Sequence, residues 1–397
     1  MRARLIRAAA GSAVIGALLA AGQPPGAAAA ADVPCSVPAL VLAMKTAASG
    51  TTLSLAPGCV YSLTESLPPV RRDLIIEGNH ATLARSQAPA TPAFSILRAD
   101  AGALAVSALN FRNGRRAITV AGTATLTVTG GTFSGNSAVN GGAILDRSDG
   151  DGPKVTGTLF RANSATGSGG AIFNISGQAG VNLSHAIFAG NTAGNGGAIY
   201  DFSVDGQHVR SSVFSDNQAA ACGALCLFSG SSMRLTDIVV RGNSATGGGG
   251  GGVSATANQG VQIDGGLISG NHAAGLAGGL YLDALWIRIT GTVIEGNSAS
   301  DGAGLYGSAE QMSLIRVTVS DNHASGYGGG VYNDWSGQAS PSSHAADDSQ
   351  IVGNRAGAGG GGIYDAVNGT FALRNTRVRG NVPDDCEPAA SVTGCGG

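Results

Sequence analysis

Four consecutive stretches of the chain repeat one pattern: FSGNSAVNGGAILD at residues 133–146, FRANSATGSGGAIFN at 160–174, FAGNTAGNGGAIYD at 188–201 and FSDNQAAACGALCLF at 214–228. An apolar residue stands three positions before an asparagine, and a glycine-rich turn with an aliphatic residue follows. The asparagine continues along the chain at steps of 25 to 32 residues. The recurring positions are Asn136, Asn163, Asn191, Asn217, Asn243, Asn271, Asn297, Asn322, Asn354 and Asn381. Such a period indicates stacked coils.

Each repeat reads as a short strand, a tight turn, a glycine-rich turn and further strand segments. In the first copy we expect Phe133 and Ile144 to face inward, and Gly135, Asn136 and the glycines at 141–142 to supply positive φ at corners. One repeat suits one turn of a parallel β-helix. We therefore predict an all-β fold, a single-stranded right-handed parallel β-helix (solenoid) of about twelve coils and about 60 Å in length. The hand follows from fold analogy and the general rule for parallel crossovers.

Stacking explains the asparagines. Coils lie about 4.8 Å apart, so equivalent side chains superpose and their amides can hydrogen-bond along the axis. Asparagine also tolerates the left-handed backbone of a sharp corner. We predict a structural asparagine ladder, and favour it over the alternative of an amide row that binds a ligand.

The chain begins with a predicted secretory signal. Arg2, Arg4 and Arg7 precede an apolar stretch that is too short to span a bilayer, and small residues follow. We expect a secreted, extracellular protein without membrane insertion after cleavage. The expected division is residues 1–31 as signal peptide, 32–65 as N-terminal cap and first coil, 66–381 as β-helix repeats and 382–397 as C-terminal cap.

Both ends of the rod are expected to be covered. Residues 36–48 are predicted to form a short capping helix, with Ser36 as its cap and Leu40 and Met44 on its apolar face. Residues 382–397 are predicted to form a lid closed by a disulfide.

Export makes disulfides plausible for all six cysteines. The candidate pairs are Cys35 with Cys59, Cys222 with Cys226, and Cys386 with Cys395. In an extended strand the Cα atoms of Cys222 and Cys226 would lie about 13 Å apart. This pair therefore requires a sharp turn near Gly223.

Charge argues against nucleic acid as a partner. Removal of residues 1–31 would leave 20 basic and 25 acidic residues. Phosphate binding needs a concentrated positive field. The charged fraction of 12% is low, but the hydrophobic fraction of 43% is phased with the repeat, which favours a packed core.

The paired motifs FxxN and GGAI resemble the repeats of polymorphic outer-membrane proteins, within the pectate-lyase-like superfamily. The GGAI copies stand at 141–144, 169–172 and 196–199, and later copies are looser. The resemblance covers roughly residues 113–381. It implies a right-handed parallel β-helix and surface adhesion, and we expect this chain to lack the C-terminal membrane-inserted domain of that family.

A column of aromatic residues is the leading candidate binding site. It consists of the positions directly after the inward aliphatic residues, which strand alternation should turn outward. Rows of aromatic rings suit sugars. The predicted carbohydrate-binding residues are Tyr281, Tyr306, Tyr332 and Tyr364, with Trp335 over the Tyr332 end. The alternative, which we weigh more heavily, is an aromatic stack that only supports itself.

Four aspartates near this column could accept hydrogen bonds from sugar hydroxyls. They are Asp201, Asp283, Asp334 and Asp365. A polysaccharide or cell-surface glycan is therefore the expected partner.

Catalytic residues remain unassigned. Asp347 and Asp348 follow His344 in a serine-rich segment, and Asp384 and Asp385 lie in the lid. Paired carboxylates can perform acid–base chemistry, but we favour solvated loop charges.

The remaining histidines are expected to be exposed polar residues. His272 and His323 should lie two coils and about 10 Å apart, which is too far for one shared metal ion. His208 and the nearby Asp205 are interpreted as polar loop residues without a catalytic role. We expect no metal site and no cofactor, and calcium would enter only with a lyase activity.

These observations favour a secreted, non-enzymatic protein for adhesion or for binding polysaccharides and cell surfaces. A polysaccharide lyase or glycoside hydrolase of the same fold is one alternative, because fold does not fix function. A purely structural surface protein is another.

Overall fold

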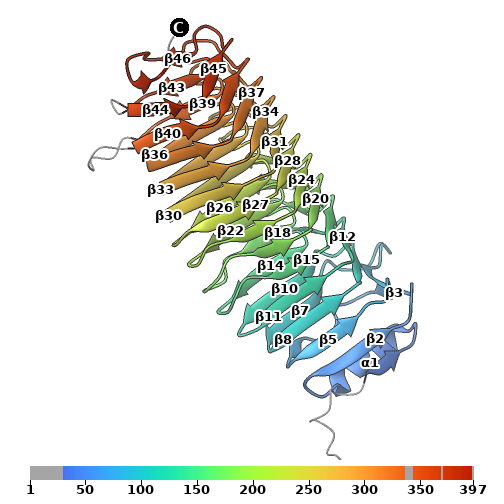
Figure 1. The fold of residues 1–397 in the computed structure, drawn as a ribbon. Coiled ribbons are helices and arrows are strands. Elements are labelled where there is room, and N and C mark those ends of the chain that lie inside the picture. The colour runs from blue at the N-terminus through green and yellow to red at the C-terminus, as the bar shows by residue number, and fades with distance from the viewer. Residues whose placement is uncertain (1–29, 336–342, 368–369, 396–397) are drawn as a thin grey trace, which may run out of the picture.

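A computed structural model describes residues 30–335, 343–367 and 370–395. Strands stack in parallel along one axis, from the capping helix at one end to β46 at the other (Figure 1). The predicted parallel β-solenoid is confirmed. The predicted signal falls almost wholly on residues 1–29, which lie outside the described ranges, and its last residue, Ala31, begins β1 and pairs with Leu53.

The described residues form three sheets, and the first contains 25 strands. Most coils contribute two strands to it, and long strands such as β30 combine both. Its strands are β1 Ala31–Val33, β2 Thr51–Leu55, β4 Val70–Arg71, β5 Leu74–Glu77, β7 Ser95–Ala101, β8 Ala103–Ser107, β10 Arg116–Gly122, β11 Thr125–Thr129, β14 Ile144–Ser148, β15 Lys154–Thr156, β18 Ile172–Asn174, β19 Asn182–Ser184, β22 Ile199–Ser203, β23 His208–Arg210, β26 Leu225–Ser229, β27 Met233–Thr236, β30 Val253–Asp264, β33 Leu280–Thr290, β36 Leu305–Ile315, β39 Val331–Asn333, β40 Ser343–Asp347, β43 Ile363–Asp365, β44 Thr370–Arg374, β46 Cys386–Glu387 and β47 Val392–Thr393.

The second sheet has thirteen strands and the third has nine. The second consists of β3 Val60–Leu63, β6 Thr82–Arg85, β9 Asn110–Arg112, β12 Thr132–Ser134, β16 Leu159–Arg161, β20 Ile187–Ala189, β24 Val213–Ser215, β28 Val239–Arg241, β31 Leu267–Ser269, β34 Val293–Glu295, β37 Thr318–Ser320, β41 Gln350–Val352 and β45 Arg377–Arg379. The third consists of β13 Ser137–Ala138, β17 Ser164–Ala165, β21 Thr192–Asn195, β25 Gln218–Ala221, β29 Ser244–Ala245, β32 His272–Ala273, β35 Ser298–Ala299, β38 His323–Ala324 and β42 Arg355–Ala356. The second sheet implies about thirteen coils, one more than predicted.

The core is built from columns of identical or similar side chains. Phe111, Phe133, Phe160, Phe188 and Phe214 are fully buried, and neighbouring rings stack with centroids 4.7–5.0 Å apart. Further along the rod, aliphatic residues of the second sheet continue this column in the same register. The coil spacing therefore matches the distance at which offset aromatic rings attract each other.

The asparagines form a continuous buried ladder. Every Nδ2 donates to the Oδ1 of the next asparagine at 2.9–3.0 Å, over nine consecutive steps. Asn243 shows the full pattern: its Nδ2 also donates to the carbonyl of Phe214, and its Oδ1 accepts from both the backbone N and the Nδ2 of Asn217. Both side-chain protons and both acceptor sites are therefore paired in the interior of the ladder.

The left-handed corner lies at the residue before each ladder asparagine, as predicted for Gly135, and not at the asparagine, for which it was also predicted. The residue before each ladder asparagine has positive φ, as in Gly135 (61°), Ala162 (50°) and Asp216 (55°). No ladder asparagine is among the positive-φ residues of the described chain. The asparagine side chain is thus used for pairing, while the preceding residue makes the turn.

The N-terminal cap is helix α1, Val37–Thr46, whose Leu40 and Met44 are buried against the first coils. Ser36 occupies the N-cap position, but its side chain makes no capping hydrogen bond, which differs from the prediction. Cys35 and Cys59 form a disulfide beside this helix.

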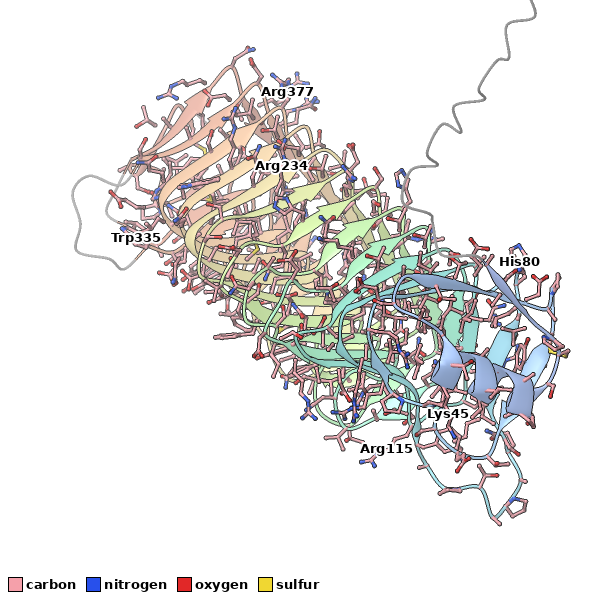
Figure 2. The ribbon with its side chains drawn as sticks, turned by 90° about the horizontal axis from the view of Figure 1, so that it is seen from below. Lys45, His80, Arg115, Arg234, Trp335 and Arg377 are labelled. Atoms are coloured by element: carbon pink, nitrogen blue, oxygen red, sulfur yellow. A yellow bond between two sulfur atoms is a disulfide. The ribbon has the colours of Figure 1, made fainter. Side chains whose placement is uncertain are left out.

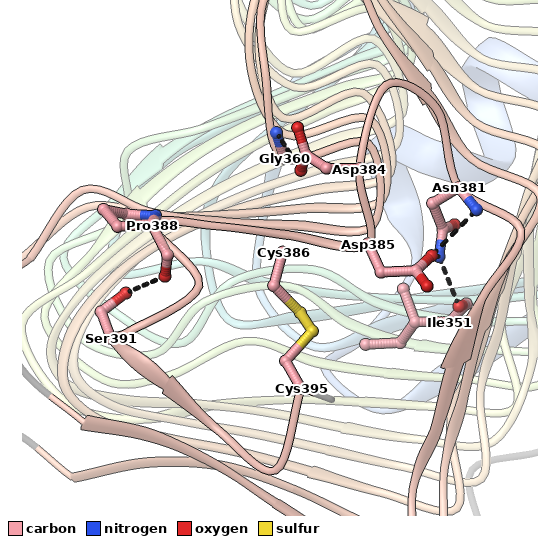
Figure 3. The surroundings of a disulfide bond; sticks show 9 residues. All are labelled: Ile351, Gly360, Asn381, Asp384, Asp385, Cys386, Pro388, Ser391 and Cys395. Carbon is pink, nitrogen blue, oxygen red and sulfur yellow. Dashed lines mark hydrogen bonds between the residues drawn. A yellow bond between two sulfur atoms is a disulfide. The ribbon is translucent and has the colours of Figure 1, made fainter. Parts of the chain in front are cut away.

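The other two predicted pairs are also bridged. Cys222 and Cys226 have Cα atoms 5.3 Å apart, because Cys222 itself adopts a φ of 55° and turns the chain. Cys386 and Cys395 close the C-terminal lid (Figure 3).

The lid also ends the ladder, as Figure 3 shows. Asp385 Oδ1 accepts from the backbone N and the Nδ2 of Asn381 at 3.0 and 2.8 Å, and Asp384 Oδ1 accepts from Gly360 N. The reading of these two aspartates as solvated loop charges was therefore wrong. They replace the acceptors that a further coil would have supplied.

We predict that Asn243→Leu destabilises the rod by about 3 kcal/mol or more. Leucine cannot accept from Asn217 or donate to Phe214, and each buried polar group left unpaired costs about 1–3 kcal/mol. The midpoint of urea unfolding measures the effect. Asn195→Leu, at an exposed asparagine, is the control, and equal midpoints for the two variants would contradict a stabilising ladder.

Candidate functional site

The four predicted tyrosines lie in register on consecutive coils. Tyr281 pairs with Tyr306, Tyr306 with Tyr332, and Tyr332 with Tyr364. Their ring centroids are 5.4, 4.8 and 5.0 Å apart. We call these four residues the tyrosine column.

The ring faces of this column are largely covered by each other. Tyr306 retains only 8% of its accessible surface, and its hydroxyl donates to Asp334. A Cβ added to Gly302 would lie 2.8 Å from the Cβ of Tyr306, so the glycine turn packs closely over the column. The column therefore stacks on itself and presents edges and hydroxyls to solvent.

Burial and acidic neighbours raise the pKa values of these tyrosines. Burial raises the pKa of Tyr332 to about 12, and the charge of Asp334 contributes. Burial raises the pKa of Tyr306 as well, together with its hydrogen bond to Asp334. The Tyr306 hydroxyl already donates its proton to Asp334, so the Tyr332 hydroxyl is the one of the two that can donate to a ligand.

The predicted acidic acceptors divide into two groups. Asp283 is half-buried and Asp334 is bonded to Tyr306. Asp201 and Asp365 are fully buried, so the expectation that they lie beside the tyrosines at the surface was wrong. Side chains alternate between the two faces of a strand, so the residue after each outward aromatic residue points into the core.

Trp335 lies at the edge of the C-terminal half of the rod (Figure 2). It is half-buried, and its indole N–H has no hydrogen-bond partner among the described residues. The loop continues through residues 336–342, which lie outside the described ranges, so its position over the Tyr332 end stays a prediction.

A groove on the same outer side of the rod as the tyrosine column was not predicted from the sequence. It has a volume of about 490 Å³ and is lined mainly by Ile175, Phe202, Val204 and Phe228. Phe202 is 60% exposed, and its ring is tilted by 44° from that of Phe228 at 6.1 Å. The signal was present in IYDFS at 199–203, because alternation puts Phe202 on the same side as Tyr200. We call this feature the aromatic groove.

The groove and the tyrosine column belong to one outer face. Phe202 pairs with Phe228, Phe228 with Thr256, and Thr256 with Asp283. Asp283 lies on the strand of Tyr281, so the two features follow each other along the axis. We call them together the aromatic face.

Buried polar residues lie on the inner side of the strands that carry the groove. Asp201 accepts from Asn174 Nδ2 at 2.8 Å, from Gln207 Nε2 at 2.6 Å and from Ser203 Oγ at 2.9 Å. Burial raises its pKa, while these hydrogen bonds act in the opposite direction.

Asp146 heads the same inward column and is less well satisfied. Its Oδ1 accepts from the N and Oγ of Ser148, but its Oδ2 is buried without a partner among the described residues. Burial raises the pKa of Asp146 to about 6.

His344 is buried, which overturns its reading as part of a solvated loop. It lies in β40, where its Nε2 donates to the carbonyl of Ala309 and its Nδ1 accepts from Asn333 Nδ2. Asn333 also donates to Asp365 at 2.7 Å. This cluster fills the inward column of the C-terminal coils.

The other sequence candidates lie at the surface. Asp348 accepts from Asn375 Nδ2, and Asp347 forms an exposed ion pair with Arg374 at 3.4 Å. His272 and His323 both pair with Ser298, one on each side, and so lie two coils apart.

Within the described ranges there is no group of three or more His, Cys, Asp or Glu side chains that could hold a metal ion. None of the helices in that part of the chain has the length and apolarity needed to span a membrane.

Three segments, residues 130–146, 157–175 and 185–201, match the Chlamydia polymorphic membrane protein (Chlamydia_PMP) repeat. They cover three successive coils, and each contains one ladder asparagine. This chain is a β-solenoid whose repeat resembles that family. Neither the curated proteins nor the solved structures include a match to the chain.

We predict that Asp146 makes the rod less stable as the pH rises. Its folded pKa of about 6 lies above the ordinary 3.8, so the folded state holds a proton that the unfolded chain releases. The stability is intact below about pH 4 and falls until about pH 6. The wild type should therefore lose about 3 kcal/mol of unfolding free energy relative to Asp146→Asn as the pH is raised from 4 to 7.

The measurement is urea unfolding across this pH range. Asp149→Asn, at an exposed aspartate, is the control and should follow the wild type. A difference between Asp146→Asn and the wild type that stays constant with pH would contradict the assignment.

Proposed function

We propose that the protein is exported to the cell surface, where it acts as a β-solenoid that binds a polysaccharide along its aromatic face. The observation that carries the proposal is the exposed ring of Phe202 over the aromatic groove. The predicted signal sequence and the match to a repeat of membrane proteins support the location.

The aromatic groove exposes more apolar surface than folding requires. Phe202 and Val204 are 60% and 61% exposed and Ile175 is 43% exposed, on adjacent coils. Contiguous apolar patches on soluble proteins usually mark binding sites. An aromatic ring offers its face to the C–H groups of a sugar ring, and the tilt between Phe202 and Phe228 leaves such a face open.

Polar groups at the groove can bind sugar hydroxyls. Asn258 is exposed and Thr256 is half-buried at its border. Both groups can donate and accept hydrogen bonds, which gives orientation to a ligand held by apolar contact.

The tyrosine column extends the site along the rod. Its rings stack on each other and are not open to sugars, but the Tyr332 hydroxyl can donate a hydrogen bond, and Asp283, on the strand of Tyr281, can accept one. A linear neutral polysaccharide that lies parallel to the axis would thus contact the apolar aromatic groove first and the polar groups of the tyrosine column next.

We predict that Phe202→Ala weakens binding to a neutral polysaccharide by about tenfold, as expected for loss of a central aromatic contact. Affinity electrophoresis in gels with xylan, β-glucan or galactomannan measures it. The ring is mostly exposed, so the melting temperature should change little.

Two variants serve as comparisons. Ile187→Ala removes an apolar side chain that is 43% exposed on the second sheet, away from the aromatic face, and should leave retention unchanged. Tyr332→Phe removes one hydroxyl and keeps the stack, so it should weaken retention less than Phe202→Ala. Equal retention of the wild type and Phe202→Ala on every polysaccharide that the wild type binds, or no binding by the wild type, would sink the proposal.

A further inference from the structure

A line of basic and uncharged polar residues runs along a different outer column from that of the aromatic face. Its positions pair coil by coil, from Lys154 through Asn182 and His208 to Arg234, and then through Gln262 to Arg288. The four basic residues among these, Lys154, His208, Arg234 and Arg288, are exposed. At one coil per step the line spans about 24 Å.

A groove lies in the middle of this line. It has a volume of about 490 Å³ and is bordered by Asn182, His208, Arg210, Arg234 and Thr236. Arg234 lies on β27 (Figure 2), and Arg210 lies on the neighbouring coil in β23. We call this feature the basic groove.

The guanidinium groups of the groove are available for a ligand. Arg234 Nη2 forms an ion pair with Asp264 at 2.8 Å, which orients the side chain and leaves its other N–H groups free of Asp264. Within the described residues, Arg210 has no ion pair. Arginine forks bind tetrahedral oxyanions through paired hydrogen bonds. Asn182 and Thr236 add uncharged polar groups beside them.

We propose that the basic groove binds the tetrahedral oxyanions, sulfate esters or phosphodiesters, of a linear acidic glycan that lies along the rod. The line of basic residues runs along the rod, which is the direction that a linear polymer bound there would follow. The chain as a whole has a formal net charge of −2, and Asp264 stands within the site, so the positive field is local and suits spaced charges better than a nucleic-acid duplex. This site goes beyond the proposed function, because it lies on a different column and selects charge.

The test compares two variants that remove the same number of charges. Arg210→Gln/Arg234→Gln alters the basic groove, and Arg161→Gln/Arg241→Gln alters exposed arginines of the second sheet. The probes are a heparin decasaccharide, a poly(glycerol phosphate) chain, uncharged dextran and a 20-base-pair DNA duplex. Binding is followed by fluorescence anisotropy between 50 and 300 mM NaCl.

The wild type should bind heparin or poly(glycerol phosphate), and the tighter of the two identifies the source of the oxyanion. The groove variant should bind that probe about tenfold more weakly. The slope of its log affinity against log salt concentration should become shallower by about two, as expected for the loss of two ionic contacts. The control variant should remain within about twofold of the wild type.

Three results would overturn the proposal: absence of binding to both acidic probes, equal loss in the two variants, or tighter binding to the DNA duplex than to either glycan. Matching melting temperatures confirm that both variants are folded. Phe202→Ala should keep full affinity for the acidic probe. The groove variant should keep its retention on neutral polysaccharide, so each proposal can fail independently.

Discussion

The coils are held in register by amide groups that have partners only when the coils are correctly stacked. Each interior ladder asparagine donates twice and accepts twice, and its partners belong to adjacent coils. A buried amide without partners costs several kcal/mol, so a slip of one residue in any coil would leave a set of polar groups unpaired. The ladder therefore sets register more strongly than the aliphatic core, which tolerates similar side chains.

A ladder of this kind needs defined ends. At the start Gly114 N donates to Asn136 Oδ1 and takes the place of a preceding asparagine. At the finish Asp385 supplies a carboxylate oxygen to Asn381. A carboxylate accepts without needing to donate, so it ends the chain of hydrogen bonds and leaves no unpaired amide proton. Helix α1 and the lid thus close the apolar core, while Gly114 at one end and Asp385 of the lid at the other close the polar ladder.

The sequence predicted the elements that depend on one repeated contact. The period and the inward phenylalanines follow from superposition of equivalent positions, and the cysteine pairs follow from their closeness in sequence. Gly135 was correctly predicted at the corner, whereas positive φ was wrongly assigned to Asn136 as well, because both glycine and asparagine tolerate that conformation. His344 was misread because its serine-rich surroundings resemble a loop, whereas pairing with β36 and β44 makes the segment a strand.

The binding site was harder to predict than the fold because exposure depends on neighbours in adjacent coils. The tyrosines attracted attention as a regular column, yet regularity allows them to cover each other. Phe202 was overlooked because its neighbours in register, Phe228 and Thr256, break the regularity and leave its ring exposed. On a solenoid, an interrupted aromatic column is thus a better indicator of an open surface than a perfect one.

The inner and outer sides of a strand are also linked energetically. Asp201 lies between Tyr200 and Phe202 in β22, and its carboxylate gathers hydrogen bonds from Asn174, Ser203 and Gln207. These bonds tie β18 and β22 to the segment that follows, beneath the aromatic groove. Rigid support lowers the entropy lost when a ligand binds, because the side chains above it are already ordered. A buried carboxylate in this position costs stability through desolvation, but it holds the strands that present Phe202 in one arrangement.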